Sequence, residues 1–205
     1  MNNTKEKILE VALNLFSQNG FSAVSIRDIC KVVQIKESSV YYHFQNKQAI
    51  FDELMIKFEN EAKKMMKKLE DSFYDNVDFN DSSFKNVCET YFEQYLMDDF
   101  CNRILRLLSI EQLDNSEIQK KYEFWVFEMP LSFQKNIFMK LIELKLISDT
   151  DSEYLAIKYY SPIYYYTQRW LLSGELTDYK KEMFSLNVYK HIQKFFDELD
   201  IQKVI

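Results

Sequence analysis

Glycine and proline are scarce in this chain, which has 2 of each among 205 residues. Both residues are concentrated at turns and at breaks between short strands, and strand patterning is weak as well. We therefore expect an all-α fold of about nine helices. The sequence also lacks an apolar run of 18 residues, a signal-peptide apolar region and a cleavage site. These absences predict a cytoplasmic protein with no membrane partner.

Cysteine is scarce too, with Cys30, Cys88 and Cys101 as the whole set. Their spacing fits no metal site, and each lies among apolar residues, which favours buried structural thiols. A redox-sensing pair of Cys88 and Cys101 is the alternative.

Enzyme motifs are missing. The chain has no phosphate-binding Walker loop, no G-x-S-x-G elbow and no H-E-x-x-H zinc motif. A di-iron helical bundle needs a glutamate three residues before histidine, but Val40 and Val188 precede His43 and His191 at that spacing. We expect no enzymatic activity, no catalytic residue, no metal and no cofactor.

What the sequence does have is a pair of short amphipathic helices within residues 25–47. Ser25 followed by Asp28 is typical of a capping box, and the apolar residues after it fall on one helical face, namely Ile26, Ile29, Cys30 and Val33. A second short helix over 37–44 buries Val40 and Phe44. Its outer face is polar and hydrogen-bonding, with Ser38, Ser39, Tyr42 and His43. Two such helices across a turn indicate a helix-turn-helix, whose second helix enters a DNA groove.

The first 55 residues or so resemble the N-terminal domain of the TetR family of transcriptional regulators. The resemblance rests on sub-motifs that occur together and in register: Ile8-Leu9, Ala12, Leu15-Phe16, Asn19-Gly20-Phe21, Ser25-Ile26-Arg27-Asp28-Ile29, Val40-Tyr41-Tyr42-His43-Phe44 and Lys47. It implies a homodimer that binds a palindromic operator in double-stranded DNA. It also implies a C-terminal helical domain for dimerisation and for a small-molecule effector, and most often a repressor that the effector releases.

Candidate DNA contacts come from the polar outer face of the second short helix and from the family resemblance. Side chains on the outer face and the flanking lysines suit phosphates and base edges, and the resemblance adds motif positions. The complete set is Ser25, Lys36, Glu37, Ser38, Ser39, Tyr41, Tyr42, His43 and Lys47. A core role for Tyr41 and a plain surface role for His43 are the alternatives.

Three residues depart from the family pattern: Gln34, Lys36 and Ser38. Gln34 stands in the turn where a small residue or glycine is usual, so a positive φ there would be strained. Operator preference therefore does not transfer from relatives.

Charge is distributed unevenly. The net charge is -6, yet residues 1–48 hold six cations and four anions, or +2, which leaves 20 cations and 28 anions, or -8, for the rest. Because +2 is modest, we expect DNA affinity to depend on hydrogen bonds to phosphate as well as on charge. A helical adaptor that does not bind DNA is the competing interpretation.

We predict two domains, a helix-turn-helix domain over 1–47 and a regulatory and dimerisation domain over 48–205. Helix 47–71 links them. A polar loop over 75–83 precedes an amphipathic helix from Phe84, and Pro130 predicts a kink. Thr150 with Glu153 predicts a capping box for a helix to about 173, and Thr177 starts the last helix, to about 199.

The C-terminal region is rich in aromatic residues. Candidate walls for a flat apolar, aromatic or cationic effector are Tyr91, Tyr95, Trp125, Phe127, Met129 and Tyr165. Candidate dimer residues on the last two helices are Tyr159, Ile163, Tyr166, Trp170, Phe184, Val188, Ile192 and Phe195. Packing in the core of one subunit is the alternative for both sets.

Overall fold

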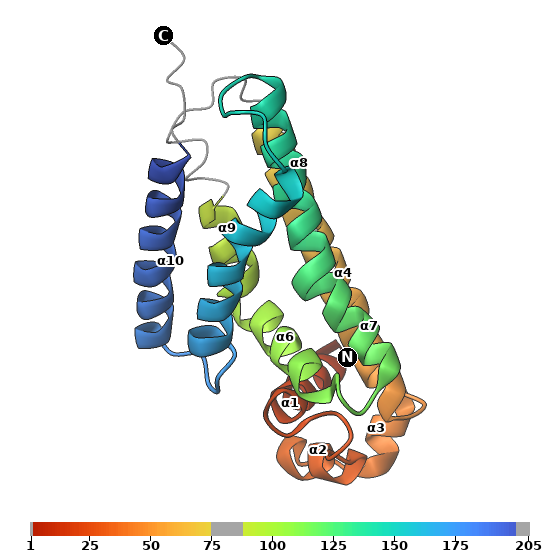
Figure 1. Ribbon diagram of the computed structural model, residues 1–205. Helices are drawn as coiled ribbons and strands as arrows, with labels where there is room; N and C mark the ends of the chain where they lie inside the picture. The colour runs from red at the N-terminus through yellow and green to blue at the C-terminus, as the bar shows by residue number, and fades with distance from the viewer. Residues whose placement is uncertain (1, 75–87, 200–205) are drawn as a thin grey trace. The chain divides into compact units, whose positions relative to one another are not determined.

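The structure, a computed structural model, describes residues 2–74 and 88–199 (Figure 1). All regular structure in these ranges is helical, which confirms the all-α prediction. The chain divides into two compact units, Met1–Gln119 and Lys120–Ile205. The predicted division at residue 47 follows a sequence motif, whereas this division follows packing. Within the described ranges, no helix is long and apolar enough to cross a bilayer.

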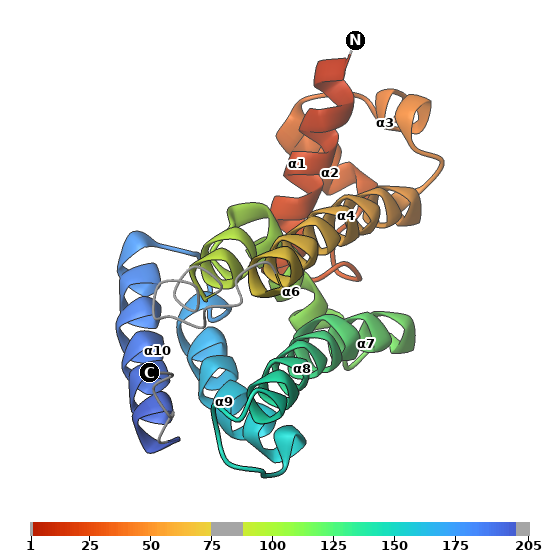
Figure 2. The same cartoon turned by 90° about the horizontal axis from the view of Figure 1, so that it is seen from above.

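The first unit holds the helix-turn-helix and the helices packed on it. Its elements are α1 (Asn2–Asn19), α2 (Ile26–Val33), α3 (Glu37–His43), α4 (Lys47–Tyr74), the π-helical segment η1 (Phe92–Leu96), α6 (Asp99–Glu111) and the beginning of α7 (Ser116–Glu123). The predicted loop 75–83 and the first residues of the helix expected from Phe84 lie outside the described residues. Figure 2 shows α1, α2 and α3 gathered around the beginning of α4.

Apolar side chains of α1, α2, α3 and α4 form the core behind α3. Ile8, Phe16, Ile29, Val40 and Ile50 have no solvent exposure. Gly20 ends α1 at φ 85°, and its N–H donates to the carbonyl of Phe16 at 2.9 Å. The Phe21 ring then packs back on Phe16, with centroids 5.3 Å apart. This core fixes the side of α3 that faces the protein.

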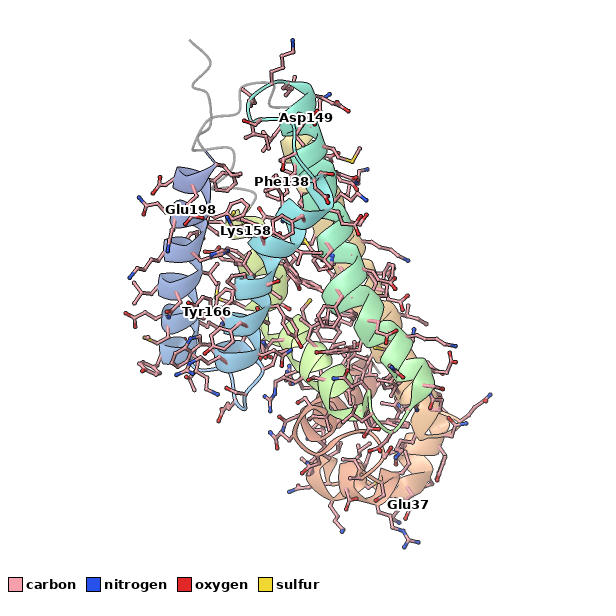
Figure 3. The ribbon with its side chains drawn as sticks, viewed as in Figure 1. Glu37, Phe138, Asp149, Lys158, Tyr166 and Glu198 are labelled. Carbon is pink, nitrogen blue, oxygen red and sulfur yellow. The ribbon has the colours of Figure 1, made fainter. Side chains whose placement is uncertain are left out.

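The second unit is built from η2 (Phe124–Glu128), α8 (Met129–Glu143), α9 (Ser152–Tyr166), η3 (Thr167–Leu171) and α10 (Asp178–Glu198). Its core joins α8, α9 and α10 through packed rings: the centroids of Phe138 and Tyr159 lie 5.7 and 5.2 Å from that of Phe195. At the surface, Lys158 of α9 pairs with Glu198 of α10 at 3.1 Å (Figure 3).

Two helix boundaries differ from the prediction. The N-cap of α9 is Asp151, whose carboxylate accepts from the N–H groups of Glu153 and Tyr154, so the expected cap at Thr150 is wrong. A carboxylate caps well because it accepts two bonds and opposes the positive helix end. Near Pro130 the helix first widens into η2, and the proline then lies in the first turn of α8, where no N–H is needed.

Candidate nucleic-acid interface

The outer face of α3 is largely open to solvent. Tyr42 is 82% exposed and Tyr41 52% exposed, whereas Val40 and Phe44 are buried. Tyr41 therefore has no core role. Ser38 is exposed with Tyr42, while Ser39 and His43 are half-buried. The short helix is thus anchored by two apolar side chains and presents hydroxyls outward, as a helix that reads a groove must.

The beginning of α2 is held by the predicted capping box. The Ser25 hydroxyl accepts from the Asp28 N–H at 3.3 Å and donates to the Asp28 carboxylate at 2.5 Å, and the Ser25 N–H donates to that carboxylate at 3.0 Å. The Ser25 hydroxyl bond, the Ser25 backbone bond and Lys31 hold the pKa of Asp28 below its usual value. Ser25 therefore orients α2, and a DNA contact would share its hydroxyl.

The turn between α2 and α3 contains a strained residue. Gln34 has φ 63° and ψ 46°, in the left-handed region that favours glycine. The N–H of Gln34 and that of Ile35 both donate to the carbonyl of Cys30, which closes the end of α2. The turn thus keeps helix-turn-helix geometry without glycine.

Lys47 is bonded to the protein itself. Its ammonium donates to the carbonyls of Phe21 and Val24, each at 2.7 Å, and lies 4.2 Å from the centre of the Phe21 ring. Burial lowers the pKa of Lys47, and the charge of Glu111 opposes that effect. The side chain therefore supports the segment between α1 and α2, and a contact of Lys47 with phosphate stays a prediction.

Arg27 is not among the predicted DNA contacts. Its side chain is 79% exposed, and its Nε donates to the Glu37 carboxylate at 3.0 Å. Glu37 begins α3, while Lys36, the N-cap, is exposed and makes no side-chain cap bond. The available signal was the opposite charge of Arg27 and Glu37 on two consecutive helices. The pair adds an oriented guanidinium to the exposed edge beside α3.

The three cysteines are thiols buried among apolar side chains. Burial and the neighbouring Asp98 raise the pKa of Cys101, and burial raises that of Cys30. Thiols with raised pKa values react poorly, which favours the structural interpretation. Across the described residues, no group of three or more histidine, cysteine or acidic side chains is arranged to hold a metal ion.

The predicted effector residues fall in separate environments. Tyr91 and Tyr95 are buried neighbours in the first unit, with ring centroids 5.5 Å apart. In the second unit Trp125 is buried, Phe127 and Met129 are half-buried, and Tyr165 is exposed. The ring of α9 that meets Phe127 is Tyr164, at 4.9 Å.

Tyr164 also belongs to a small polar chain inside the second unit. Its hydroxyl lies 3.2 Å from the Tyr122 hydroxyl, which accepts from the Gln168 side-chain amide at 3.2 Å. Burial, followed by the bond to Tyr122, raises the pKa of Tyr164. Tyr122 and Tyr164, which the prediction omitted, therefore combine with Gln168 to offer aromatic surface and hydrogen-bonding groups.

Most predicted dimer residues are packed inside their own subunit. Buried within the second unit are Tyr159, Ile163, Phe184, Val188, Ile192 and Phe195, whereas Tyr166 and Trp170 are half-buried. The prediction did not separate the apolar residues of these helices that face the core from those that stay exposed. The exposed apolar side chains of α9 and α10 are Tyr154, Ile157, Tyr165, Tyr179 and Leu186.

Residues 8–54 match the family described as "Bacterial regulatory proteins, tetR family". The chain is 43% identical over 49 residues to IcaR of Staphylococcus aureus strain Newman, a negative transcriptional regulator of a biofilm operon. That match covers 24% of this chain and 26% of the relative. The matching IcaR of Staphylococcus epidermidis is 45% identical over 47 residues, 23% of this chain and 25% of the relative. The chain thus matches about a quarter of the length of these relatives.

Solved structures are similar over nearly the whole chain. A TetR-family regulator structure from Mesorhizobium loti aligns with a TM-score of 0.67 and 16% identity, covering 96% of each chain. The fatty acid degradation regulator FadR from Bacillus halodurans aligns with a TM-score of 0.66 and 16% identity, covering 97% of each chain. At such identity these likenesses show the fold alone.

Proposed function

Because residues 8–54 form a helix-turn-helix domain of the TetR family, we propose that the chain is a sequence-specific DNA-binding transcriptional regulator. The observation that carries this proposal is α3, whose apolar side chains anchor it while Ser38, Tyr41 and Tyr42 stand in solvent. Their hydroxyls donate and accept, so they suit base edges in a major groove. We propose that the chain represses transcription, as the name of IcaR states for that protein.

The charged edge of the helix-turn-helix supports phosphate contact. Arg27 and Lys36 are exposed on either side of the turn, and Arg27 is oriented by Glu37. An oriented guanidinium binds phosphate or a guanine edge with two parallel bonds, unlike an ammonium. Together with hydroxyls on α3, these cations supply both the non-specific and the specific part of binding.

We propose that the active form is a homodimer whose two α3 helices read half-sites about 34 Å apart in a palindromic operator. Exposed apolar side chains along α9 and α10 support a self-complementary surface, since a twofold interface uses the same patch from each subunit. Tyr165 and Leu186 contribute large areas there.

We further propose that a small-molecule effector releases the operator by favouring another conformation. A planar aromatic effector that carries a hydrogen-bonding group is supported by the hydrogen-bonded side chains of Gln168, Tyr122 and Tyr164, which lie beside Phe127. Two structural relatives are described as a flavonoid-responsive regulator, FrrA, and as SmeT, the repressor of a multidrug efflux pump. They align with TM-scores of 0.55 and 0.59 at 15% and 19% identity.

The proposal is tested by selecting duplexes from a randomised library with the wild-type protein and measuring their affinity by fluorescence anisotropy. Replacing Tyr42 and His43 by alanine should weaken specific binding by ~1 to 3 kcal/mol for each base-edge hydrogen bond that the substitution removes, without unfolding. Tyr42→Phe is the matched variant, because it keeps the ring and removes only the hydroxyl. Failure to select any duplex at low salt would favour a helical adaptor.

A further inference from the structure

The last residue of α6 reaches into the segment between α1 and α2. Glu111 is only 4% exposed, and one carboxylate oxygen accepts from the Ser22 N–H at 2.8 Å while the other accepts from the Ser22 hydroxyl at 2.8 Å. A buried carboxylate is costly unless its oxygens are satisfied. Here both are bonded to one residue, 89 positions earlier in the chain.

Gly20 provides the space that this carboxylate occupies. A Cβ on Gly20 would overlap the Glu111 Oε1 atom, and the φ of 85° disfavours other residues as well. The glycine therefore ends α1 and also admits a side chain from α6. Gly20 thus serves both the turn after α1 and the contact of that turn with α6.

The same segment is also held by Lys47, at the beginning of α4. Glu111 binds the donors of Ser22, whereas Lys47 binds the carbonyls of Phe21 and Val24. The chain continues from Val24 directly into Ser25, the N-cap of α2. Glu111 as an acceptor and Lys47 as a donor thus fix the segment that leads into α2.

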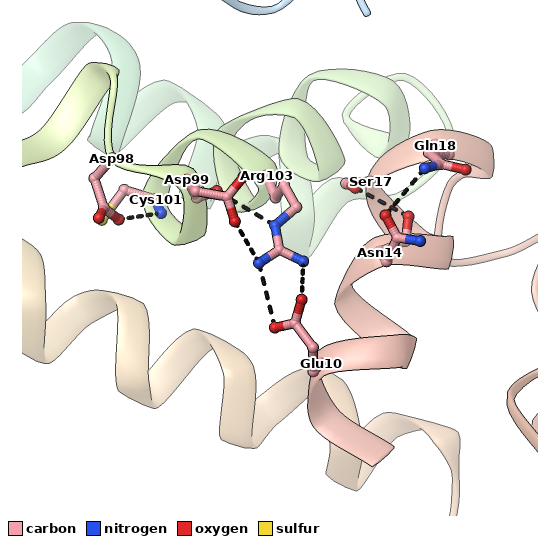
Figure 4. A network of polar contacts seen from close by, with 8 residues as sticks. All are labelled: Glu10, Asn14, Ser17, Gln18, Asp98, Asp99, Cys101 and Arg103. Atoms are coloured by element: carbon pink, nitrogen blue, oxygen red, sulfur yellow. Dashed lines mark hydrogen bonds and ion pairs between the residues drawn. The ribbon is translucent and has the colours of Figure 1, made fainter. Parts of the chain in front are cut away.

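A second connection joins α6 to α1. The guanidinium of Arg103 donates to both carboxylate oxygens of Glu10, at 2.7 and 3.2 Å, and pairs with Asp99 at 2.6 Å (Figure 4). The Arg103 side chain is 14% exposed. Two parallel bonds fix the orientation of a guanidinium. Arg103 thus binds α1, and Glu111 binds the segment that follows α1. These two contacts link α6 to the helix-turn-helix.

We propose that Glu111 is a positioning residue for DNA recognition, which holds residues 20–24 so that α2 and α3 meet the operator at the correct angle. This inference rests on the proposed DNA-binding function and goes beyond it by assigning control of operator affinity to the end of α6. Glu111 acts through Ser22 and touches no DNA.

Removal of the Glu111 charge distinguishes positioning from electrostatics, because the two predict opposite changes in DNA affinity. Removing a negative charge from a DNA-binding protein strengthens its attraction to phosphate. Glu111→Gln removes the charge but keeps an acceptor for the Ser22 N–H and an amide that can donate to the Ser22 hydroxyl. Both bonds become neutral and weaker, so positioning predicts weaker binding instead. Glu93→Gln makes the same charge change at an exposed residue of η1 and is the matched control.

Binding is measured on a duplex selected by the wild-type protein, at constant salt and at a temperature where circular dichroism shows every variant folded. We expect Glu111→Gln to bind about tenfold more weakly, the effect of replacing hydrogen bonds to a charged group by neutral ones. Ser22→Ala should have a similar effect, and the double variant should be little worse than either single one. Glu93→Gln should bind like the wild type, and the slope of affinity against salt should stay constant.

Hydrogen exchange supplies a readout that does not require DNA. Amides of residues 20–28 should exchange faster in Glu111→Gln than in Glu93→Gln, because the bonds that hold the segment are neutral and weaker. Wild-type affinity in folded Glu111→Gln and Ser22→Ala, additive effects or unchanged exchange would each overturn the inference. If the wild-type protein and Glu93→Gln select no duplex, the proposed function fails and the positioning role fails with it.

Discussion

Arg27 of α2 and Glu37 of α3 are joined across the turn of the helix-turn-helix, with the Arg27 Nε atom 3.0 Å from the Glu37 carboxylate. This bond uses the inner nitrogen of the guanidinium. In the part of the chain that the structure describes, the two terminal nitrogens of Arg27 have no other partner. They form the kind of planar fork that binds phosphate or guanine.

Arg27→Lys should therefore weaken operator binding by ~1 to 3 kcal/mol although the charge is kept, because an ammonium cannot make two parallel bonds. Anisotropy titrations on the selected duplex would measure this loss. Lys31→Arg, on the same helix and also exposed, is the control and should have little effect. Equal affinity of Arg27→Lys and the wild type would leave Arg27 as a simple source of charge.

Gln34→Gly should stabilise the protein by about 1 kcal/mol, because the left-handed conformation costs other residues about that much. Thermal unfolding followed by circular dichroism would show a higher midpoint. Gln45→Gly changes the same residue type where φ is not positive, so it should bring no stabilisation. A lower midpoint for Gln34→Gly would mean that the Gln34 side chain contributes more than its backbone costs.

Asp28 should make stability depend on pH. Its pKa is lower in the folded protein than the ordinary value of 3.8, so its contribution is present above pH 3.8 and is lost as the pH falls through the folded pKa. The gap in unfolding midpoint between wild type and Asp28→Asn should therefore be constant near neutral pH and shrink in acid. Asp52→Asn serves for comparison, and a gap that widened in acid would contradict this linkage.

Leu186→Glu should separate subunits without unfolding them. Leu186 is 63% exposed on α10, so the fold loses little, but a charge in the proposed twofold surface would be buried and repeated. Light scattering after size-exclusion chromatography would show a monomer. Ile56→Glu on α4 is the matched control, since Ile56 is 60% exposed. A dimeric Leu186→Glu would place the interface elsewhere.

Local signals were enough for much of the first unit. The capping box at Ser25 and the apolar faces of the two short helices act over three or four residues, and the structure confirms them. Signals in the second unit were less decisive. Thr150 and Asp151 both suit an N-cap, and which one caps depends on where the chain enters α9.

The helices, their order and the family match of residues 8–54 follow from the sequence alone. Helical period, caps and turn residues are properties of neighbours in the chain. Which apolar side chains of α9 and α10 are buried depends on tertiary packing, since both helices also carry exposed apolar residues such as Ile157 and Leu186. Packing also brought Glu111 to Ser22 and Arg103 to Glu10. Such contacts join residues about 90 positions apart, and no local pattern encodes them.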